Sequence, residues 1–246
     1  MPLPPVNPTP PAPKPCVLIP AYREEARIGA VVAETLLFCP DVIVIDDGSP
    51  DATADAARAA GATVLQHVRN KGKGEALFTG FQYAREHGFG LAITMDADGQ
   101  HAPSDIPAFL KMYERTHVSC IVGSRMDDTA TMPLVRRLTN RYMSYTLSRL
   151  MRQHVPDTQC GFRLYHLSVV PTEPPSKGAG RYAAESEILL HIALAGHSIG
   201  SVPIQTIYSD QHSKINPVAD TIRFYRMLHR FKKIRRQARR GKKILP

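Results

Sequence analysis

Two carboxylates stand at the end of an apolar run in the middle of the chain. Asp96 and Asp98 follow the run 91–95, and Gln100 falls on the same two-residue period. Alternate residues at the end of a strand point to the same side, so these three side chains would present their oxygen atoms together. Mg²⁺ and Mn²⁺ prefer such hard oxygen ligands. Asp and Gly are also common in turns that end strands, so the pattern predicts a metal site only in combination with other residues.

The elements that position these carboxylates alternate between strand and helix patterns along 16–122. The strand segments are near-continuous apolar runs, which is typical of a parallel sheet with helices on both faces. The sequence therefore predicts an α/β fold with a Rossmann-like, mainly parallel sheet. The predicted strands are 16–19, 42–45, 63–67, 91–95 and 119–122, and the predicted helices are 26–39, 52–60, 75–86 and 103–114.

Two further polar clusters follow predicted strands and are expected at the edge of the sheet where ligands bind. In a cleft that held a nucleotide diphospho-sugar, Tyr22 could pack on the base, Glu24 could orient a hydroxyl group and Asp47 could accept hydrogen bonds from the base or ribose. Tyr22 could equally be a packed aromatic residue, and Asp47 could cap the next helix. The loop 70–74 carries two lysines between glycines, but it lacks the Gly-x-x-x-x-Gly-Lys-Ser/Thr spacing of a phosphate loop.

The alternation ends after Arg125. A predicted helix at 134–151 carries Arg136, Arg137 and Asn140, which together with Arg125 could bind a second anion opposite the donor. The arginine pair could also be a solvated helix face. The remaining predicted elements are a loop at 157–163, a helix at 182–195, a strand at 199–207 and a helix from 218 onward.

Length and charge describe one large neutral domain with a basic end. The chain has 246 residues, 43% apolar composition and a net charge of +9. Nine Lys or Arg residues and no acid lie between Arg230 and Lys243, so the charges elsewhere sum to zero. This distribution argues against a nucleic-acid-binding surface over the body of the protein. The four scattered cysteines indicate reduced thiols in a cytosolic protein, and no apolar stretch is long enough to span a membrane.

We divide the chain into three parts. Residues 1–15 contain eight prolines and predict an extended, disordered leader. Residues 16–228 form the predicted catalytic domain, and 229–246 form a basic C-terminal tail.

The last predicted helix has an amphipathic pattern. It places Phe224, Leu228, Phe231 and Ile234 on one face, with cations elsewhere. Such a segment would suit the surface of an anionic bilayer. The alternative is that the apolar stripe packs on the domain and the cations are solvated.

Six segments, in this order, resemble the inverting family-two glycosyltransferases, in particular the dolichol-phosphate and polyprenol-phosphate mannose synthases. The similarity spans about residues 16–228. The segments are PAYRE at 20–24, DDGSPD at 46–51, MDADGQH at 95–101, GSR at 123–125, GFR at 161–163 and SK at 213–214. The resemblance implies an A-type glycosyltransferase fold and transfer of a sugar from a nucleotide diphospho-sugar to a polyprenyl phosphate.

The resemblance also implies roles for particular residues. The donor would be bound by Pro20, Tyr22, Glu24, Ile45, Asp47, Asp96, Ala97, Asp98, Gln100 and Lys214. The metal ion, Mg²⁺ or Mn²⁺, would be held by Asp96, Asp98 and Gln100. The acceptor phosphate would be bound by Arg125, Arg136 and Asn140. The residues with catalytic roles would be Asp98, Arg125 and Arg136.

Some alternatives stay open within this family. Tyr208 stands where mannose synthases commonly have an arginine before Lys214, so the donor could carry mannose, glucose or an N-acetylated sugar. A lipid phosphate is already anionic and needs no base, and in-line attack would invert the anomeric carbon. A saccharide or protein hydroxyl acceptor would instead need a carboxylate base, for which Glu185, Glu187 and Asp157 are candidates. A sugar nucleotidyltransferase is disfavoured, because no Gly-rich loop follows the first strand.

The expected partners follow from these assignments. They are a nucleotide-sugar donor, a lipid-phosphate acceptor and an anionic membrane surface contacted through the basic tail, with no nucleic acid. We therefore expect a cytoplasmic protein that is peripheral on the cytoplasmic face of a membrane.

Overall fold

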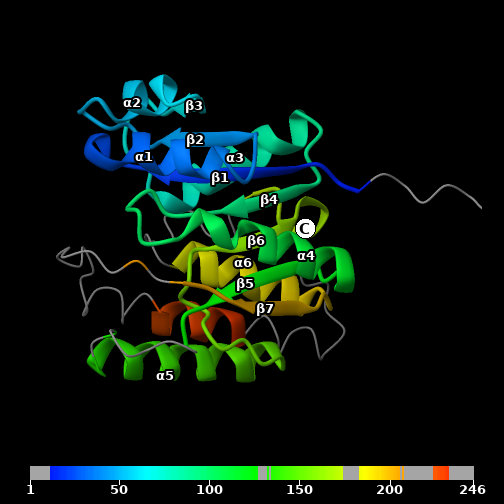
Figure 1. Ribbon diagram of the computed structural model, residues 1–246. Helices are drawn as coiled ribbons and strands as arrows, with labels where there is room; N and C mark the ends of the chain where they lie inside the picture. The colour runs from blue at the N-terminus through cyan, green and yellow to red at the C-terminus, as the bar shows by residue number, and fades with distance from the viewer. Residues whose placement is uncertain are drawn as a thin grey trace, which may run out of the picture.

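The structure, a computed structural model, describes residues 12–126, 132, 134–173, 183–205, 207 and 224–232, without the side chains of Arg136 and Ala183. These residues form a seven-stranded sheet in the order β3-β2-β1-β4-β6-β5-β7 (Figure 1). The strands are β1 (Pro15–Ala21), β2 (Val42–Asp46), β3 (Thr63–Gln66), β4 (Leu91–Thr94), β5 (Cys120–Ser124), β6 (Arg163–His166) and β7 (Ile199–Pro203). The helices are α1 (Glu25–Leu36), α2 (Thr53–Ala59), α3 (Lys73–Glu86), α4 (Ile106–Thr116), α5 (Leu134–Met151) and α6 (Ala183–Leu194), with 3₁₀ turns η1 (Pro103–Asp105) and η2 (Leu167–Val169) and a further helix at 224–232.

The mainly parallel sheet is confirmed. β1 is parallel to both β2 and β4, β3 is parallel to β2, and β5 is parallel to β7. All five side chains of β2 are buried, as expected for a strand covered on both faces.

β6 is the exception to the parallel arrangement, and the sequence did not predict it. It lies between β4 and β5 and is antiparallel to both. The strand has only four residues and begins with Arg163, a residue type that is seldom fully buried, so it does not have the apolar pattern of the other strands.

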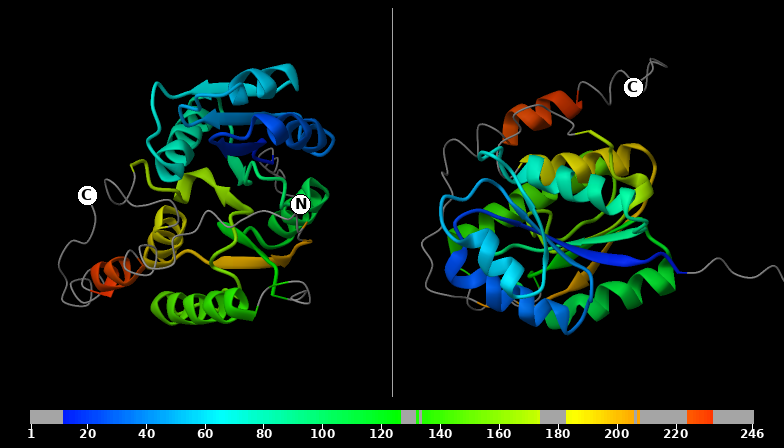
Figure 2. Two further views of the ribbon diagram at one scale, coloured as in Figure 1. Left: turned by 90° about the vertical axis from the view of Figure 1, so that its left-hand side faces the viewer. Right: turned by 90° about the horizontal axis from the view of Figure 1, so that it is seen from above.

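Helices cover both faces of the sheet, as predicted (Figure 2). α3 packs against β1 and β2 on one face, where it also contacts α6. α1 and α4 lie on the opposite face, with α1 against β2 and α4 against β6 and β7. α2 lies beside β3 at one end of the sheet, and α5 lies beyond β7 at the other end, where it contacts α6 (Figure 1).

The strand directions bring the predicted polar clusters to one edge. β1, β2 and β4 are parallel, and β5 points the same way because β6 is antiparallel to both β4 and β5. Their carboxyl ends lead into the segments 20–24, 46–51 and 96–100 and into Arg125. The fold therefore gathers the candidate donor, metal and acceptor residues at the edge where open α/β sheets bind ligands.

The helix 224–232 packs on the body of the protein, which corrects one expectation. Phe224, Leu228 and Phe231 are 1% to 6% exposed, so this stripe does not face a bilayer. The ring centroid of Phe231 lies 5.6 Å from that of His191 in α6. Burial of these large apolar side chains against the domain is the more favourable arrangement in water. Ile234 and the rest of the basic tail lie outside the described residues.

Among the described residues, no helix is both long enough and apolar enough to cross a membrane.

Candidate active site

Asp47 organises the loop that follows β3. Its Oδ1 accepts a hydrogen bond from the backbone N–H of Lys71 at 2.8 Å, and its Oδ2 accepts one from Gly72 at 2.7 Å. Nδ1 of His67 lies 2.8 Å from the same Oδ1, and Nε2 of His67 lies 2.9 Å from Oγ1 of Thr79. The Asp47 carboxylate is buried and closes the loop 70–72 just before α3 begins.

The turn after Asp47 requires a glycine. Gly48 has a φ of +69°, in the left-handed region that residues with a Cβ rarely adopt. A Cβ at this position would lie 2.5 Å from the carbonyl carbon of Arg69. The turn after β2 therefore packs closely against the backbone of Arg69 and Asn70.

The other predicted nucleoside contacts differ in how accessible they are. Pro20 and Tyr22 are half-buried at the end of β1, and the guanidinium of Arg23 lies 5.3 Å from the centre of the Tyr22 ring. Glu24 is buried, with its backbone N–H donating to Oγ1 of Thr53. Ile45 is fully buried, and its side chain faces Gly80 of α3. A ligand could therefore contact Ile45 only after this part of the core moved.

Lys73 connects two carboxylates at the centre of the site. Its Nζ hydrogen-bonds Oδ1 of Asp96 and lies 3.1 Å from Oε1 of Glu185 in α6. Burial opposes the charged form of each group, but the opposite charges outweigh it, so the pKa of Lys73 is raised and that of Asp96 is lowered. A Cβ on Gly161 would lie 2.9 Å from Oδ2 of Asp96 and 3.1 Å from Nζ of Lys73. Gly161 therefore lets the loop before β6 close on this ion pair.

Asp98 and Gln100 form the exposed side of the same cluster. Both residues are half-buried, and the backbone N–H of Gln100 donates to Oδ1 of Asp98 at 3.0 Å. Burial raises the pKa of Asp98, and the neighbouring charge of Asp96 raises it further. Ala97, between the two carboxylates, is buried.

His101 is buried beside the turn 96–100 and hydrogen-bonds its first residue. Its Nδ1 accepts a hydrogen bond from the backbone N–H of Asp96 at 3.2 Å, and its ring stacks on Phe162 with centroids 5.2 Å apart. Burial lowers the pKa of His101 to about 4, so the ring is neutral near pH 7.

The carboxylate pair fits a divalent cation only if a ligand completes the site. Among the described residues, no group of three or more His, Cys, Asp or Glu side chains could enclose a metal ion. Asp96 and Asp98 can still supply carboxylate oxygens, and Mg²⁺ is often held by one or two carboxylates together with substrate phosphates. Asp96, Asp98 and Glu185 bring three carboxylates together near Lys73, so an additional cation would favour an anionic diphosphate beside them.

Arg125 lies where it was predicted, but it is paired with a carboxylate. Its Nε donates to Oδ2 of Asp157 at 2.7 Å, and its Nη2 donates to Oδ1 at 3.0 Å. Both residues are buried, so this is a two-point ion pair shielded from water. Nη1 is the guanidinium nitrogen that Asp157 does not engage. Asn140, the other described candidate for the acceptor phosphate, is buried on α5.

Arg163 holds together the segments beside the Arg125–Asp157 pair, a role that the sequence did not indicate. The residue is 1% exposed. It donates hydrogen bonds to the backbone carbonyls of Cys160, Thr158 and Glu185 and to the hydroxyl of Tyr165. It thereby ties the loop before β6 to α6.

Two predicted site residues cannot be compared with the structure. Lys214 lies outside the described residues. Arg136 lies in α5, but its side chain is not described. The sequence analysis did not predict that Lys73 contacts Asp96 and Glu185. These partners lie on other elements, and no local spacing indicates the contact.

The chain matches proteins of known family. The model of the family "Glycosyl transferase family 2" matches residues 16–172. The chain is 33% identical over 215 residues to UDP-N-acetylglucosamine–dolichyl-phosphate N-acetylglucosaminyltransferase of Methanococcus voltae, covering 79% of this chain and 86% of that protein. It is 30% identical over 204 residues to polyprenol monophosphomannose synthase of Mycolicibacterium smegmatis, covering 76% of this chain and 75% of that protein.

Solved structures share the fold. Glucosyl-3-phosphoglycerate synthase from Mycobacterium tuberculosis in complex with uridine diphosphate superposes with a TM-score of 0.70 at 21% identity, covering 89% of this chain and 80% of that one. The predicted A-type glycosyltransferase fold is therefore confirmed. Because the family match spans more than half of the sequence, the chain belongs to glycosyltransferase family 2 and is a glycosyltransferase.

Proposed function

We propose that this enzyme transfers a sugar from a nucleotide diphospho-sugar to the phosphate of a polyprenyl phosphate. The observation that carries the proposal is that all three carboxylates predicted as bases for a hydroxyl acceptor are paired with cations. A phosphate acceptor needs no such base, because its second pKa is near 6 and it is already anionic at neutral pH.

The three ion pairs are separate. Asp157 is fully buried and bound by Arg125. Glu185 is paired with Lys73, and Glu187 is paired with Arg230 of the helix 224–232. Each of these three carboxylates is buried and has a cation against its oxygens, so none is presented to an acceptor hydroxyl group. This arrangement disfavours a saccharide or protein hydroxyl as the acceptor.

The donor is proposed to bind along the strand ends. Its nucleoside would lie near Pro20, Tyr22, Glu24 and Asp47, with Ile45 beneath, and its diphosphate would lie near Asp96, Ala97, Asp98 and Gln100. Lys214 is proposed to contact the donor phosphates from the far end of the chain. Lys73 adds a fixed positive charge at this point, next to Asp96.

A divalent cation is proposed to accompany the donor. Asp96 and Asp98, with Gln100 beside them, would hold Mg²⁺ or Mn²⁺ together with the diphosphate, and the ion would neutralise charge on the departing nucleoside diphosphate. The enzyme from Mycobacterium tuberculosis that shares the fold was crystallised with Mn²⁺ and uridine diphosphate. This supports the proposal at the level of the fold.

The transfer requires positioning of two anions. An oxygen of the acceptor phosphate attacks the anomeric carbon while the bond to the diphosphate breaks and the nucleoside diphosphate leaves with the electron pair. Arg125, Arg136 and Asn140 are proposed to orient the acceptor phosphate on the side opposite the leaving group, which inverts the anomeric configuration. One relative named above is called a dolichyl-phosphate N-acetylglucosaminyltransferase and another a polyprenol monophosphomannose synthase, which supports a lipid phosphate as the acceptor.

The proposed acceptor implies work at a membrane. We propose that the protein associates peripherally with the cytoplasmic face, and that the basic tail beyond Lys232 contributes electrostatic attraction to anionic lipids.

An assay that compares a polyprenyl phosphate with the matching polyprenol as acceptor tests the proposed function. Labelled guanosine diphosphate mannose, uridine diphosphate glucose and uridine diphosphate N-acetylglucosamine are each incubated with a short polyprenyl phosphate or with the matching polyprenol, with Mn²⁺ or with chelator. We expect lipid product from one donor, only with the phosphate and only with metal. Transfer to the polyprenol or to a saccharide at a comparable rate would contradict the proposal.

A further inference from the structure

Arg23 has a backbone conformation that is rare for its residue type. Its φ is +58°, in the left-handed region that residues with a Cβ seldom adopt. Among the described residues, His117 and Arg152 are the other residues besides glycine with a positive φ. Both directly follow a helix, where a left-handed residue is a common way to end the helix. Arg23 instead lies between β1 and α1, and left-handed residues in such places are concentrated at ligand sites.

Hydrogen bonds from the turn after β2 hold this conformation. The backbone N–H of Arg23 donates to Oγ of Ser49 at 3.0 Å, and the hydroxyl of Ser49 in turn donates to the carboxylate of Asp46. The backbone N–H of Asp47 donates to the carbonyl of Ala21 at 2.9 Å. The segment that carries Arg23 is therefore fixed against the segment that carries Asp47, which is proposed to bind the nucleoside.

The side chain of Arg23 lies over the ring of Tyr22. The guanidinium carbon is 5.3 Å from the ring centroid, within the range of a cation–π contact. Arg23 is exposed and Tyr22 is half-buried, so a molecule from solvent can reach the guanidinium group. A guanidinium group is planar and more weakly hydrated than an ammonium group, which allows it to stack on a flat ring. The pair is therefore suited to binding a flat aromatic group.

We propose that Arg23 binds the nucleobase of the donor, with its guanidinium plane stacked on the base beside Tyr22. This inference rests on the proposed function, because it adds a residue to the donor site. The contact with Tyr22 favours the nucleoside as the target, since the donor diphosphate is proposed to lie near Asp96 and Asp98 after β4. The fixed backbone and the contact with Tyr22 orient the side chain before the donor binds, which lowers the entropic cost of binding.

Two substitutions separate stacking from charge and from backbone strain. Arg23→Asn removes the guanidinium group and introduces a residue that accepts the left-handed conformation, whereas Arg23→Lys keeps the charge without the planar group. Calorimetry measures the binding of uridine diphosphate and of guanosine diphosphate with Mn²⁺. For the nucleotide that binds the wild-type protein more tightly, we expect about tenfold weaker binding in both variants. The free energy of unfolding of Arg23→Asn should not fall, because the substitution relieves backbone strain.

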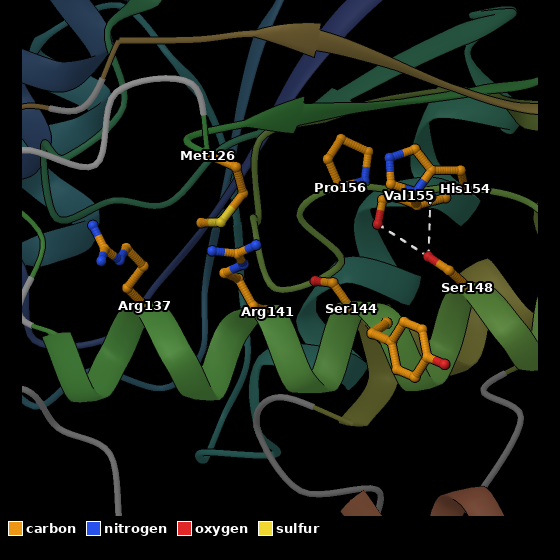
Figure 3. A pocket seen from close by; sticks show the side chains of 9 residues that line it. Met126, Arg137, Arg141, Ser144, Ser148, His154, Val155 and Pro156 are labelled. Carbon is orange, nitrogen blue, oxygen red and sulfur yellow. Dashed lines mark hydrogen bonds between the residues drawn. The ribbon is translucent and has the colours of Figure 1, made fainter.

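Arg152→Asn is the matched control. Arg152 is an exposed arginine with a φ of +59°, and it follows α5, beyond the β7 end of the sheet. Its surroundings are also held by hydrogen bonds. The backbone N–H of Gln153 donates to the carbonyl of Ser148 at 3.2 Å, and that of Val155 donates to Oγ of Ser148 at 3.0 Å (Figure 3). The control thus removes the same side chain from the same backbone conformation, and nucleotide binding should be unchanged.

Three results would contradict the inference in different ways. Wild-type nucleotide affinity in Arg23→Asn would overturn the inference and leave the proposed function intact. Wild-type affinity in Arg23→Lys together with a loss in Arg23→Asn would show that Arg23 supplies charge to the phosphates, which would also overturn a stacking contact with the base. A wild-type protein that bound neither nucleotide would overturn the proposed donor site and this inference with it.

Discussion

The candidate donor residues and the candidate acceptor residues, called the donor side and the acceptor side, are held in place by different kinds of interaction. On the donor side, the carboxylate of Asp47 at the end of β2 accepts hydrogen bonds from the backbone N–H groups of Lys71 and Gly72. On the acceptor side, charged side chains join segments that are distant in sequence, as Arg125 does with Asp157. On the donor side, Asp47 is thus held by backbone N–H groups, whereas on the acceptor side Arg125 is held by a buried ion pair with a carboxylate of the loop before β6.

The largest expected effect is on stability and falls on the acceptor side. Asp157→Leu leaves the buried Arg125 guanidinium without its partner, and we expect it to lower the free energy of unfolding by about 3 to 5 kcal/mol. Arg125→Met/Asp157→Leu removes both charges and should recover most of that loss while transfer stays impaired. Urea unfolding of the three proteins measures the difference. A double variant as unstable as the single one would show that packing, not the unpaired charge, limits stability.

On the donor side, the largest expected effect is on activity. Asp98→Asn removes a carboxylate charge from the proposed metal and diphosphate site, and we expect turnover to fall about 100-fold or more with little change in stability. Steady-state rates across a Mn²⁺ titration provide the measurement. Asp55→Asn on α2 is the matched control. Near-normal turnover of Asp98→Asn would remove this residue from the site.

Lys73 joins the two sides, since it contacts Asp96 on the donor side and Glu185 of α6. Lys73→Met should weaken nucleoside diphosphate binding about tenfold, because it removes a positive charge and leaves two carboxylates without their cation. Lys71→Met changes an exposed lysine two residues earlier and should bind normally. Calorimetric titration of the two variants compares them directly. If both bound the nucleotide equally well, Lys73 would have only a structural role.

The smallest expected effect concerns the helix 224–232. Burial lowers the pKa of His191, and the positive charge of Arg230 lowers it further. The folded-state pKa lies below that of the unfolded chain, which is near 6.5, so stability is complete above about pH 6.5 and declines as the pH falls below it. His191→Gln should reduce the slope of unfolding free energy against pH below about pH 6.5. An unchanged slope would mean that His191 titrates normally in the folded protein.

The sequence predicted the donor side better than the acceptor side, for physical reasons. The strands there are continuous apolar runs, and their order in the sequence places Asp47 and Asp96 at one edge. The bounds of α5 were also predicted correctly as 134–151. Apolar periodicity does not encode β6, whose first residue Arg163 is stable in the core only because carbonyls of three other residues accept its hydrogen bonds.

Contacts between residues distant in the sequence also explain two further differences from the sequence predictions. The pattern of Phe224, Leu228 and Phe231 fits a bilayer and a protein surface equally well, and only the tertiary contact with α6 distinguishes them. Likewise, the charge of Arg125 indicated an anion, but its position opposite Asp157 depends on the loop before β6. The sequence therefore did not predict contacts between charged groups that are distant in the chain.

The central claim is that the acceptor phosphate attacks without a protein base, and the pH dependence of kcat/KM for the acceptor tests it most directly. The profile is measured with a polyprenyl phosphate and with the matching methylene phosphonate, whose second ionisation occurs at higher pH. We predict that activity rises with the second ionisation of the acceptor, near pH 6 for the phosphate, and that the rise moves to higher pH with the phosphonate. A rise at the same pH for both acceptors would assign the ionisation to the enzyme and contradict the base-free mechanism.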